Sequence, residues 1–583
     1  MKASPTRAVP SNSPDISAGG RTRAVVQNRR RTHISFSANS ASIGSGQRIG
    51  KYTMRRRLGA AHLEPPVVCG ATLLKQYHME HPAEQQQMRL TGDSHRPLFH
   101  RRPACVAALG VLIGLMFFAL FGAPGASAAD AGAGLIVLLL LLLASLRLYR
   151  PALLPLLFAV LAFLSAALQC PAAPEQTAGY LTGRVAEAPE HASARTVLVL
   201  KDAALDGAPI RGRVELIVHG STRAEYGRHI GVHTSLWPSD ADWLAYDRSL
   251  GIAAHAAAGA SALAYGDVER DAYGALLEAR AAIADRIGAL FPAHPDVACG
   301  LLLGGRLSHM DAGVLSRFRA AGIAHLLAVS GLHVGILAAA LLVLLRLIRP
   351  LWLRFSVFSA FLLAYAALTA FTPSVLRASV MLLCVLPAVP LRRRTDLPSS
   401  LSLAFVLVLL LRPFALGTAG FQLSFSAILG LALLAPVLKA RFSVLGERAA
   451  AALSSSIAVL AATVPPIASF FGELPLASVA ANLLILPLLP LFLVPAAAAL
   501  PLSCLSLPLG RAVAALPEAV LDVLLRVAAA GGTPHLRLLP PSPLGALLFY
   551  AAILLASPLF LVRPRIKALL AGLCAAACFL FWR

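Results

Sequence analysis

The sequence predicts a polytopic α-helical membrane protein of about 11–13 spans that carries one small extracytoplasmic β-barrel domain. The first observation is composition: 57% of the 583 residues are hydrophobic and 14% are charged, against roughly 25% charged residues in soluble domains. The second is a series of apolar runs, each near the length of about 20 residues that a spanning helix needs. The third is one polar segment with β-strand character between them. Such a composition excludes a soluble enzyme, a disordered protein and a fibrous repeat.

The first 102 residues differ from the rest of the chain. They hold 17 Lys and Arg residues against 5 Asp and Glu residues, and so contribute +12 of the formal net charge of +23. The stretch is rich in Ser, Gln and Arg and lacks sustained hydrophobic periodicity, which predicts a basic disordered leader over 1–102. A start codon placed too far upstream is the alternative, with Met54 or Met88 as the true first residue.

An N-terminal membrane region is expected over 103–172. Basic clusters mark cytoplasmic loops. Arg101 and Arg102 precede the first apolar run, and Arg147 and Arg150 close the second, so the N-terminus is expected inside. The third run then ends on the outer side. The three runs are 105–122, 132–149 and 151–170.

Residues 176–266 interrupt the apolar pattern with 8 basic and 9 acidic residues. Period-2 alternation and β-branched residues predict five short strands, with Asp206-Gly207 as a turn. This strand count predicts an OB-like barrel on the outer face. Such domains stack bases on aromatic side chains, for which Tyr180, Trp237 and Trp243 are the candidates. The charge balance of −1 does not favour DNA binding, and a scaffolding or docking role is equally compatible with it. The predicted strands are 180–187, 196–201, 214–219, 230–236 and 252–256.

Amphipathic helices that lie on the membrane are expected over 267–322, because charged and apolar residues interleave there. From 323 to 583 the chain is almost wholly apolar, and basic clusters between pairs of runs fit a consistent in–out threading. The proline-rich part at 475–530 predicts broken or re-entrant segments. The expected spans are 323–347, 353–371, 374–391, 398–411, 414–438, 449–471, 475–500, 505–530, 543–562 and 566–582.

One of these apolar runs opens with an unusual group of polar residues. Polar groups in a span are costly and face a bundle interior or a water-filled path. At the head of a long helix Ser330 and His333 share a face, whereas His325 points about 80° away. Close helix packing at Gly331 and Gly335 is one interpretation. A membrane-embedded Ser/His hydrolase is another, although no orienting carboxylate is evident within the span.

The same residues resemble a known family, the ComEC-type competence proteins, which translocate DNA in natural transformation. The stretch AGIAHLLAVSGLHVG at 321–335 is similar to the family's aGi-HLLAiSGLHvG signature. LLLGGR at 301–306 resembles its LllGd-r element, with Gly305 in place of the usual acidic residue. The resemblance extends upstream to GRV at 183–185 and DRSLGI at 247–252, and so covers roughly 100–560. Further matches follow in family order. They are TPSVLRA at 372–378, GFQLSF at 420–425 with LG at 429–430, and ANLL at 481–484 followed by Pro487.

The resemblance implies a multi-pass subunit of the bacterial inner membrane that moves single-stranded DNA into the cytoplasm. It also implies the short form of the family, since the HxHxDH cluster of the metallo-β-lactamase-like nuclease domain does not occur. A passive conduit is therefore expected, not an enzyme, with no catalytic residue, cofactor or metal. Because there is no GxxxxGK[ST] phosphate loop, a separate ATPase or DNA-binding proteins in the cytoplasm are expected as partners.

The partners outside the cell, the number of copies in the pore and the substrate class each have alternatives. The resemblance also implies a periplasmic or surface DNA receptor, and the pore is formed by one copy or by a homodimer. A transporter of a small polar or lipid-linked substrate is the rival of the DNA conduit.

A path for a polyanion has to avoid lipid, and few polar or small residues of the spans are candidates for it. Arg377, early in its helix, either contacts phosphate or snorkels to the interface. Gln422 and Asn482 are interpreted as interhelical hydrogen-bond partners ahead of pore groups. The candidates for the path or for a functional motif are His325, Ser330, Gly331, His333, Gly335, Arg377, Gln422, Ser424 and Asn482.

Overall fold

The computed structural model of the chain separates into two units, Met1–Val67 and Val68–Arg583. In the first unit the described elements are β1 (Ser40–Ile43) and β2 (Gln47–Gly50), which form an antiparallel pair. The expected basic leader otherwise lies outside the described residues. The described ranges are 40–43, 47–50, 102–121, 128–148, 152–172, 177–192, 195–240, 243–304, 310–388, 396–475, 478–530, 535–557 and 564–580.

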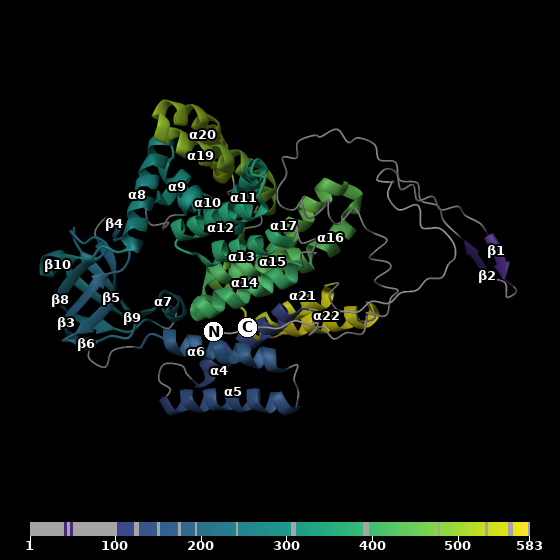
Figure 1. The fold of residues 1–583 in the computed structure, drawn as a ribbon, viewed down its shortest axis with the longest axis horizontal. Helices are drawn as coiled ribbons and strands as arrows, with labels where there is room; N and C mark the ends of the chain where they lie inside the picture. Colours follow the sequence, from purple (N-terminus) through teal and green to yellow (C-terminus); the bar gives the residue numbers. More distant parts are fainter. Residues whose placement is uncertain are drawn as a thin grey trace, which may run out of the picture. The chain divides into compact units, whose positions relative to one another are not determined.

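Five strands close into a small barrel in the polar segment of the second unit (Figure 1). The order around the barrel is β8–β3–β5–β7–β9, and a short pairing of β8 with β9 closes the ring. All these pairs are antiparallel except β7 with β9, which is parallel. The strands are β3 (Ala178–Val185), β5 (Arg195–Leu205), β7 (Arg213–His219), β8 (Arg228–Trp237) and β9 (Ile252–Gly259).

The barrel is built by the alternation that predicted its strands. Every second residue of β7 is buried, which places Val214, Leu216 and Val218 in the core with side chains from all the other strands. Asp206 and Gly207 both have positive φ, 49° and 83°, as a two-residue hairpin turn requires. Three short strands extend the sheet, β4 (Glu190–Ala192) and β6 (Ala208–Pro209) beside β5 and β10 (Ala264–Val268) beside β8.

Helices make up most of the remaining described chain (Figure 1). Three precede the barrel, and α8 leads out of it. They are α4 (Pro103–Phe121), α5 (Ala128–Leu148), α6 (Leu153–Gln169), α7 (Leu244–Leu250), α8 (Ala272–Leu290), α9 (Pro295–Leu303), α10 (Ala312–Ala320), α11 (Gly331–Leu345), α12 (Leu351–Leu368), α13 (Pro373–Ala388), α14 (Leu397–Leu411), α15 (Ala419–Leu433), α16 (Ala435–Arg441), α17 (Glu447–Phe470), α18 (Ser478–Ile485), α19 (Leu488–Leu505), α20 (Leu507–Ala530), α21 (Pro543–Ala556) and α22 (Pro564–Leu580). Short elements between them are η3 (Ala260–Ala262), η5 (Ala324–Leu326), η6 (Pro413–Gly417), η7 (Ser443–Leu445), β11 (Glu473–Pro475) and β12 (His535–Arg537).

Four helices of the described chain are long and apolar enough to cross a membrane: α4, α12, α17 and α19. The bent pair α15 and α16 makes up to five. Other expected spans correspond to shorter apolar helices, among them α6, α11, α13, α14 and α21. The structure thus fits a multi-pass membrane protein, and the finer count of about 11–13 spans stays a prediction.

Two features of the spans differ from expectation. The expected span at 505–530 corresponds to α20. This helix is long enough to cross a membrane but has too many charged residues to count among the candidate spans: Arg511, Glu518, Asp522 and Arg526. The break predicted in the proline-rich part occurs between α18, which ends at Ile485, and α19, which begins at Leu488. A sharp bend of 45° that was not predicted lies between α15 and α16. Pro436 explains it, because a proline at the start of α16 cannot donate to the preceding turn.

Candidate functional site

The signature segment forms the start of α11. Ser330 is the N-cap, and its Oγ accepts a hydrogen bond from the Leu332 amide at 3.3 Å. His333 reaches back, so that its Nδ1 accepts from the Ser330 amide at 3.3 Å and lies 2.8 Å from the Ser330 hydroxyl. The two side chains together make a capping box. The first role of the Ser/His pair is therefore to begin a helix.

His333 is fully buried, and its second ring nitrogen has no hydrogen-bond partner among the described residues. Because Nδ1 accepts the Ser330 amide proton, the ring hydrogen resides on Nε2. A buried donor without an acceptor costs about 1–3 kcal/mol. The capping box therefore satisfies one side of the imidazole and leaves the other open to a polar partner.

Arg377 lies in the first turns of α13 and is 5% exposed. Its Nε donates to the Ser424 hydroxyl of α15 at 2.8 Å, and its guanidinium lies 5.9 Å from the centre of the Phe425 ring. Nη1 contacts the Met381 Sδ at 3.7 Å. The guanidinium is thus held between helices by a hydroxyl, a ring and a thioether, and it does not snorkel to an exposed position.

Gly331 brings the start of α11 against this guanidinium. A Cβ at this position would lie 2.4 Å from Arg377 Nη2, closer than any real contact. A side chain at position 331 would therefore displace the guanidinium from this place. Three segments that are far apart in the sequence therefore lie together: Ser330-Gly331, Arg377 and Ser424. We call them the Arg377 cluster.

The charge of Arg377 is not balanced within the described part of the chain, where no carboxylate lies at ion-pair distance from it. A guanidinium cannot release its proton in a protein. An ionisable residue inside an apolar helix bundle is therefore a functional-site hypothesis, and its missing partner is an anion.

Four other predicted residues lie outside this cluster. His325 lies in η5 and is exposed. The prediction that it shares a helix with His333 is wrong, because α11 begins only after the N-cap at Ser330. A Cβ on Gly335 would meet nothing within 4 Å, so close packing occurs at Gly331 alone. Gln422 donates to the Leu416 carbonyl at 2.9 Å, just before its own helix. Asn482 is partly buried in α18.

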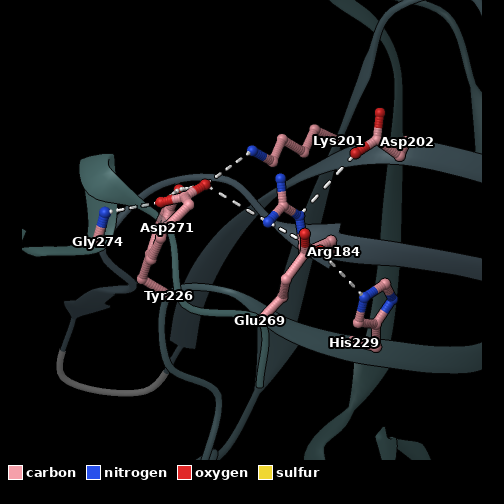
Figure 2. Close-up of polar contacts among 8 residues, drawn as sticks. All are labelled: Arg184, Lys201, Asp202, Tyr226, His229, Glu269, Asp271 and Gly274. Carbon is pink, nitrogen blue, oxygen red and sulfur yellow. Dashed lines mark hydrogen bonds and ion pairs between the residues drawn. The ribbon is translucent and has the colours of Figure 1, made fainter. Parts of the chain in front are cut away.

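A second buried arginine, which sequence reasoning did not single out, lies in the barrel (Figure 2). Arg184 of β3 is 8% exposed and lies 3.0 Å from Glu269, 3.5 Å from Asp271 and 3.9 Å from Asp202. The carboxylates come from β5 and from the link between β10 and α8. No sequence pattern pairs these segments, because their contacts are set by barrel closure.

Asp271 joins this group to α8. Its carboxylate accepts the Gly274 amide at 2.8 Å as the N-cap of the helix, and it accepts the Tyr226 hydroxyl at 2.7 Å. The Tyr226 hydrogen bond and the Gly274 amide hold the pKa of Asp271 below its usual range. Burial, together with this hydrogen bond, raises the pKa of Tyr226 to about 12. Tyr226 therefore stays a neutral donor and Asp271 an ionised acceptor at neutral pH.

The three predicted stacking residues of the barrel do not form one platform. Tyr180 packs on His233 at 4.8 Å between ring centres, Trp237 stacks on His255 at 6.4 Å, and Trp243 meets Tyr246 edge-on at 6.0 Å. Within the described residues no ring contact joins any two of the three. Their role in base stacking stays a prediction.

The family model for competence proteins matches residues 301–563. That range contains α11, α13 and α15, and therefore the whole Arg377 cluster. We call residues 301–563, the range that matches the competence-protein model, the competence domain. The cluster lies where three motifs of this competence domain meet.

Part of the chain is also similar to a named protein. The chain is 32% identical over 192 residues to ComE operon protein 3 of Bacillus subtilis (strain 168), which covers 33% of this chain. The match spans about a quarter, 24%, of the length of that relative. No solved structure matches the chain.

Proposed function

We propose that the chain is an inner-membrane channel subunit that moves single-stranded DNA into the cytoplasm during natural transformation. The observation that carries the proposal is the uncompensated Arg377 cation at the meeting point of three competence-domain motifs. DNA is a polyanion, and phosphate is a preferred partner of the planar guanidinium fork. A conduit for DNA supplies the anion that the described chain does not place beside Arg377.

The contacts of Arg377 leave its terminal nitrogens suited to this task. Nε is engaged by Ser424, which fixes the orientation of the fork. Nη1 contacts only a thioether among the described residues, and sulfur is a weak acceptor. Phe425 gives the cation a polarisable neighbour without neutralising it. A transient phosphate would bind more strongly here than in water, because the surroundings are apolar.

Hydrolysis by Ser330 and His333 is less well supported. The serine hydroxyl lies 2.8 Å from His333, as a nucleophile and base would. However, His333 is fully buried, and its Nε2 meets no orienting carboxylate within the described residues. The capping box accounts for the contact without catalysis. A passive conduit, driven by a separate cytoplasmic ATPase or by DNA-binding proteins, is therefore our proposal.

We propose that the barrel is an OB-like domain on the outer side. Five strands in a closed Greek-key order, with one parallel pair between β7 and β9, support this fold. An outer location follows from the basic clusters before α4 and after α5, which favour an N-terminus inside. A DNA receptor outside and assembly as a homodimer belong to the same proposal.

Deletion of the gene in a transformable host tests the function most simply. Labelled DNA is expected to bind at the cell surface and fail to reach the cytoplasm, and the wild-type gene restores entry. A strain without the gene that still takes labelled DNA into the cytoplasm normally would contradict the conduit. Uptake of small polar solutes in the same strains separates the rival transporter, since a DNA conduit leaves it unchanged.

A further inference from the structure

The short helix α7 presents two exposed aromatic side chains on the barrel. Trp243 is 61% exposed and Tyr246 is 49% exposed, and their rings meet edge-on at 6.0 Å. α7 is fixed to the barrel, because buried Asp247 lies 3.0 Å from His255 of β9, which in turn lies 3.4 Å from Glu215 of β7. The aromatic pair is thus held outward by a rigid attachment.

α7 also contacts the end of an apolar helix. It packs against η6, the turn that directly follows α14, and a Cβ on Gly417 of η6 would lie 3.1 Å from the Ala245 side chain. Phe414 of the same turn packs edge-on against Phe118 of α4 at 6.0 Å. Ala245, one residue before Tyr246, therefore lies close to the turn that follows α14.

A second attachment lies at the end of another apolar helix. Arg211, just before β7, donates from Nη2 to the Ala167 carbonyl at 2.6 Å and to the Leu168 carbonyl at 3.3 Å, in the last turn of α6. Leu168 itself is 75% exposed. Two apolar helices, α6 and α14, thus end against the same side of the barrel, next to a cation and an aromatic pair.

We propose that this side of the barrel lies in the lipid interface, with Trp243 and Tyr246 anchored among the headgroups. Trp and Tyr gather at the level where spanning helices end, because their rings are apolar with one polar atom. Single-stranded DNA is the other class of partner for exposed rings. The position of the pair beside the ends of two apolar helices favours lipid.

The test uses tryptophan fluorescence of the full chain in phosphatidylcholine nanodiscs. The chain has four tryptophans, so W237F/W352F/W582F leaves Trp243 alone. Nitroxide lipids labelled at the headgroup or near the middle of the acyl chain report depth, and iodide reports contact with water. Trp352, 71% exposed in the candidate span α12, is the lipid-facing control when it is retained alone.

Headgroup nitroxide is expected to quench Trp243 at least about twofold more than mid-chain nitroxide, because the ring lies at the interface. Strong quenching by iodide with none by either lipid label would overturn the proposal. Protection of Trp243 from iodide by an oligo-dT strand, without lipid quenching, would assign the surface to DNA. If the triple variant does not fold, the difference between wild type and W243S gives the Trp243 share of headgroup quenching, with the same expected result.

Discussion

Two buried arginines, one in the barrel and one in the competence domain, lie in opposite surroundings. Arg184 is 8% exposed and has three carboxylates at 3.0, 3.5 and 3.9 Å. Arg377 is 5% exposed and contacts a hydroxyl, an aromatic ring and a thioether. The residue type and the burial are nearly the same, and the difference lies entirely in the neighbours.

This difference separates a structural charge from a functional one. Taking an ion out of water costs several kcal/mol even after relaxation. Around Arg184 the fold itself supplies the counter-charges, so the group holds the barrel to α8 without any ligand. Around Arg377 the described chain supplies dipoles and a ring, and the balancing anion has to come from outside. The predictions below test this contrast, from the largest expected effect to the smallest.

Arg377→Gln is expected to lower DNA uptake by at least about 100-fold, because it removes the only cation of the cluster. Arg377→Lys keeps the charge but not the planar fork, so uptake should fall only about tenfold. Transformation frequency, normalised to the amount of protein in the membrane, is the measurement. Equal uptake by Arg377→Gln and wild type would remove the functional role of the charge.

Gly331→Ala is expected to lower uptake about tenfold, because its Cβ, 2.4 Å from Nη2, displaces the guanidinium from Ser424. Gly335→Ala is the matched control four residues on, where a Cβ meets nothing within 4 Å. The control should transform like wild type and gain up to about 1 kcal/mol of helix stability. Equal DNA uptake by the two variants would show that the contact between Gly331 and Arg377 is not needed for uptake.

Arg184→Met is expected to lower the free energy of unfolding by about 2 kcal/mol, because it removes the buried cation shared by three carboxylates. Asp271 keeps Lys201 at 3.7 Å. The effect is reduced by solvent, since the Glu269 side chain is 60% exposed. Thermal unfolding in detergent, followed by tryptophan fluorescence, measures it. Arg223→Met, at an exposed arginine, is the control and should change stability by less than about 0.5 kcal/mol. A loss no larger than that of the control would contradict a structural role for Arg184.

Tyr226→Phe keeps the ring against Gly274 and removes the hydroxyl that Asp271 accepts. The expected loss of stability is about 1 kcal/mol. The pKa of Asp271 in the folded state lies below its usual value, so its contribution is present above the unfolded pKa and is lost as pH falls through the folded pKa. Without the Tyr226 hydrogen bond the folded-state pKa of Asp271 rises toward the unfolded value, so the loss is smaller and is complete at higher pH. Unfolding curves over acidic pH values check the shift, and an unmoved acid limb would show that Tyr226 does not act through Asp271.

The sequence could predict the local features. The five strands of the barrel lie within a few residues of their predicted positions, because the alternation of apolar and polar residues is a local pattern. The Asp-Gly dipeptide at 206–207 predicted a turn, and both residues have the positive φ that such a turn needs. The residues of the Arg377 cluster were all named. The contacts between these residues could not be predicted, because they depend on how α11, α13 and α15 pack.

The errors have the same origin. His325 was placed on the helix of His333 because periodicity cannot show that a capping box starts the helix at Ser330. Gly335 shares a face with Gly331, but whether a neighbouring helix lies there is a tertiary property. The Arg184 group was missed because its members come from β3, β5, β8 and the segment before α8, far apart in sequence.

The central claim is that the anion beside Arg377 is the transforming strand. A photocrosslinking amino acid in place of Met381, whose sulfur lies 3.7 Å from Arg377 Nη1, tests it during uptake of labelled DNA. Leu363, 65% exposed on α12, is the lipid-facing control position. The account predicts that DNA label joins the chain from position 381 and not from position 363. Transforming cells in which position 381 acquires no more label than position 363 would contradict it.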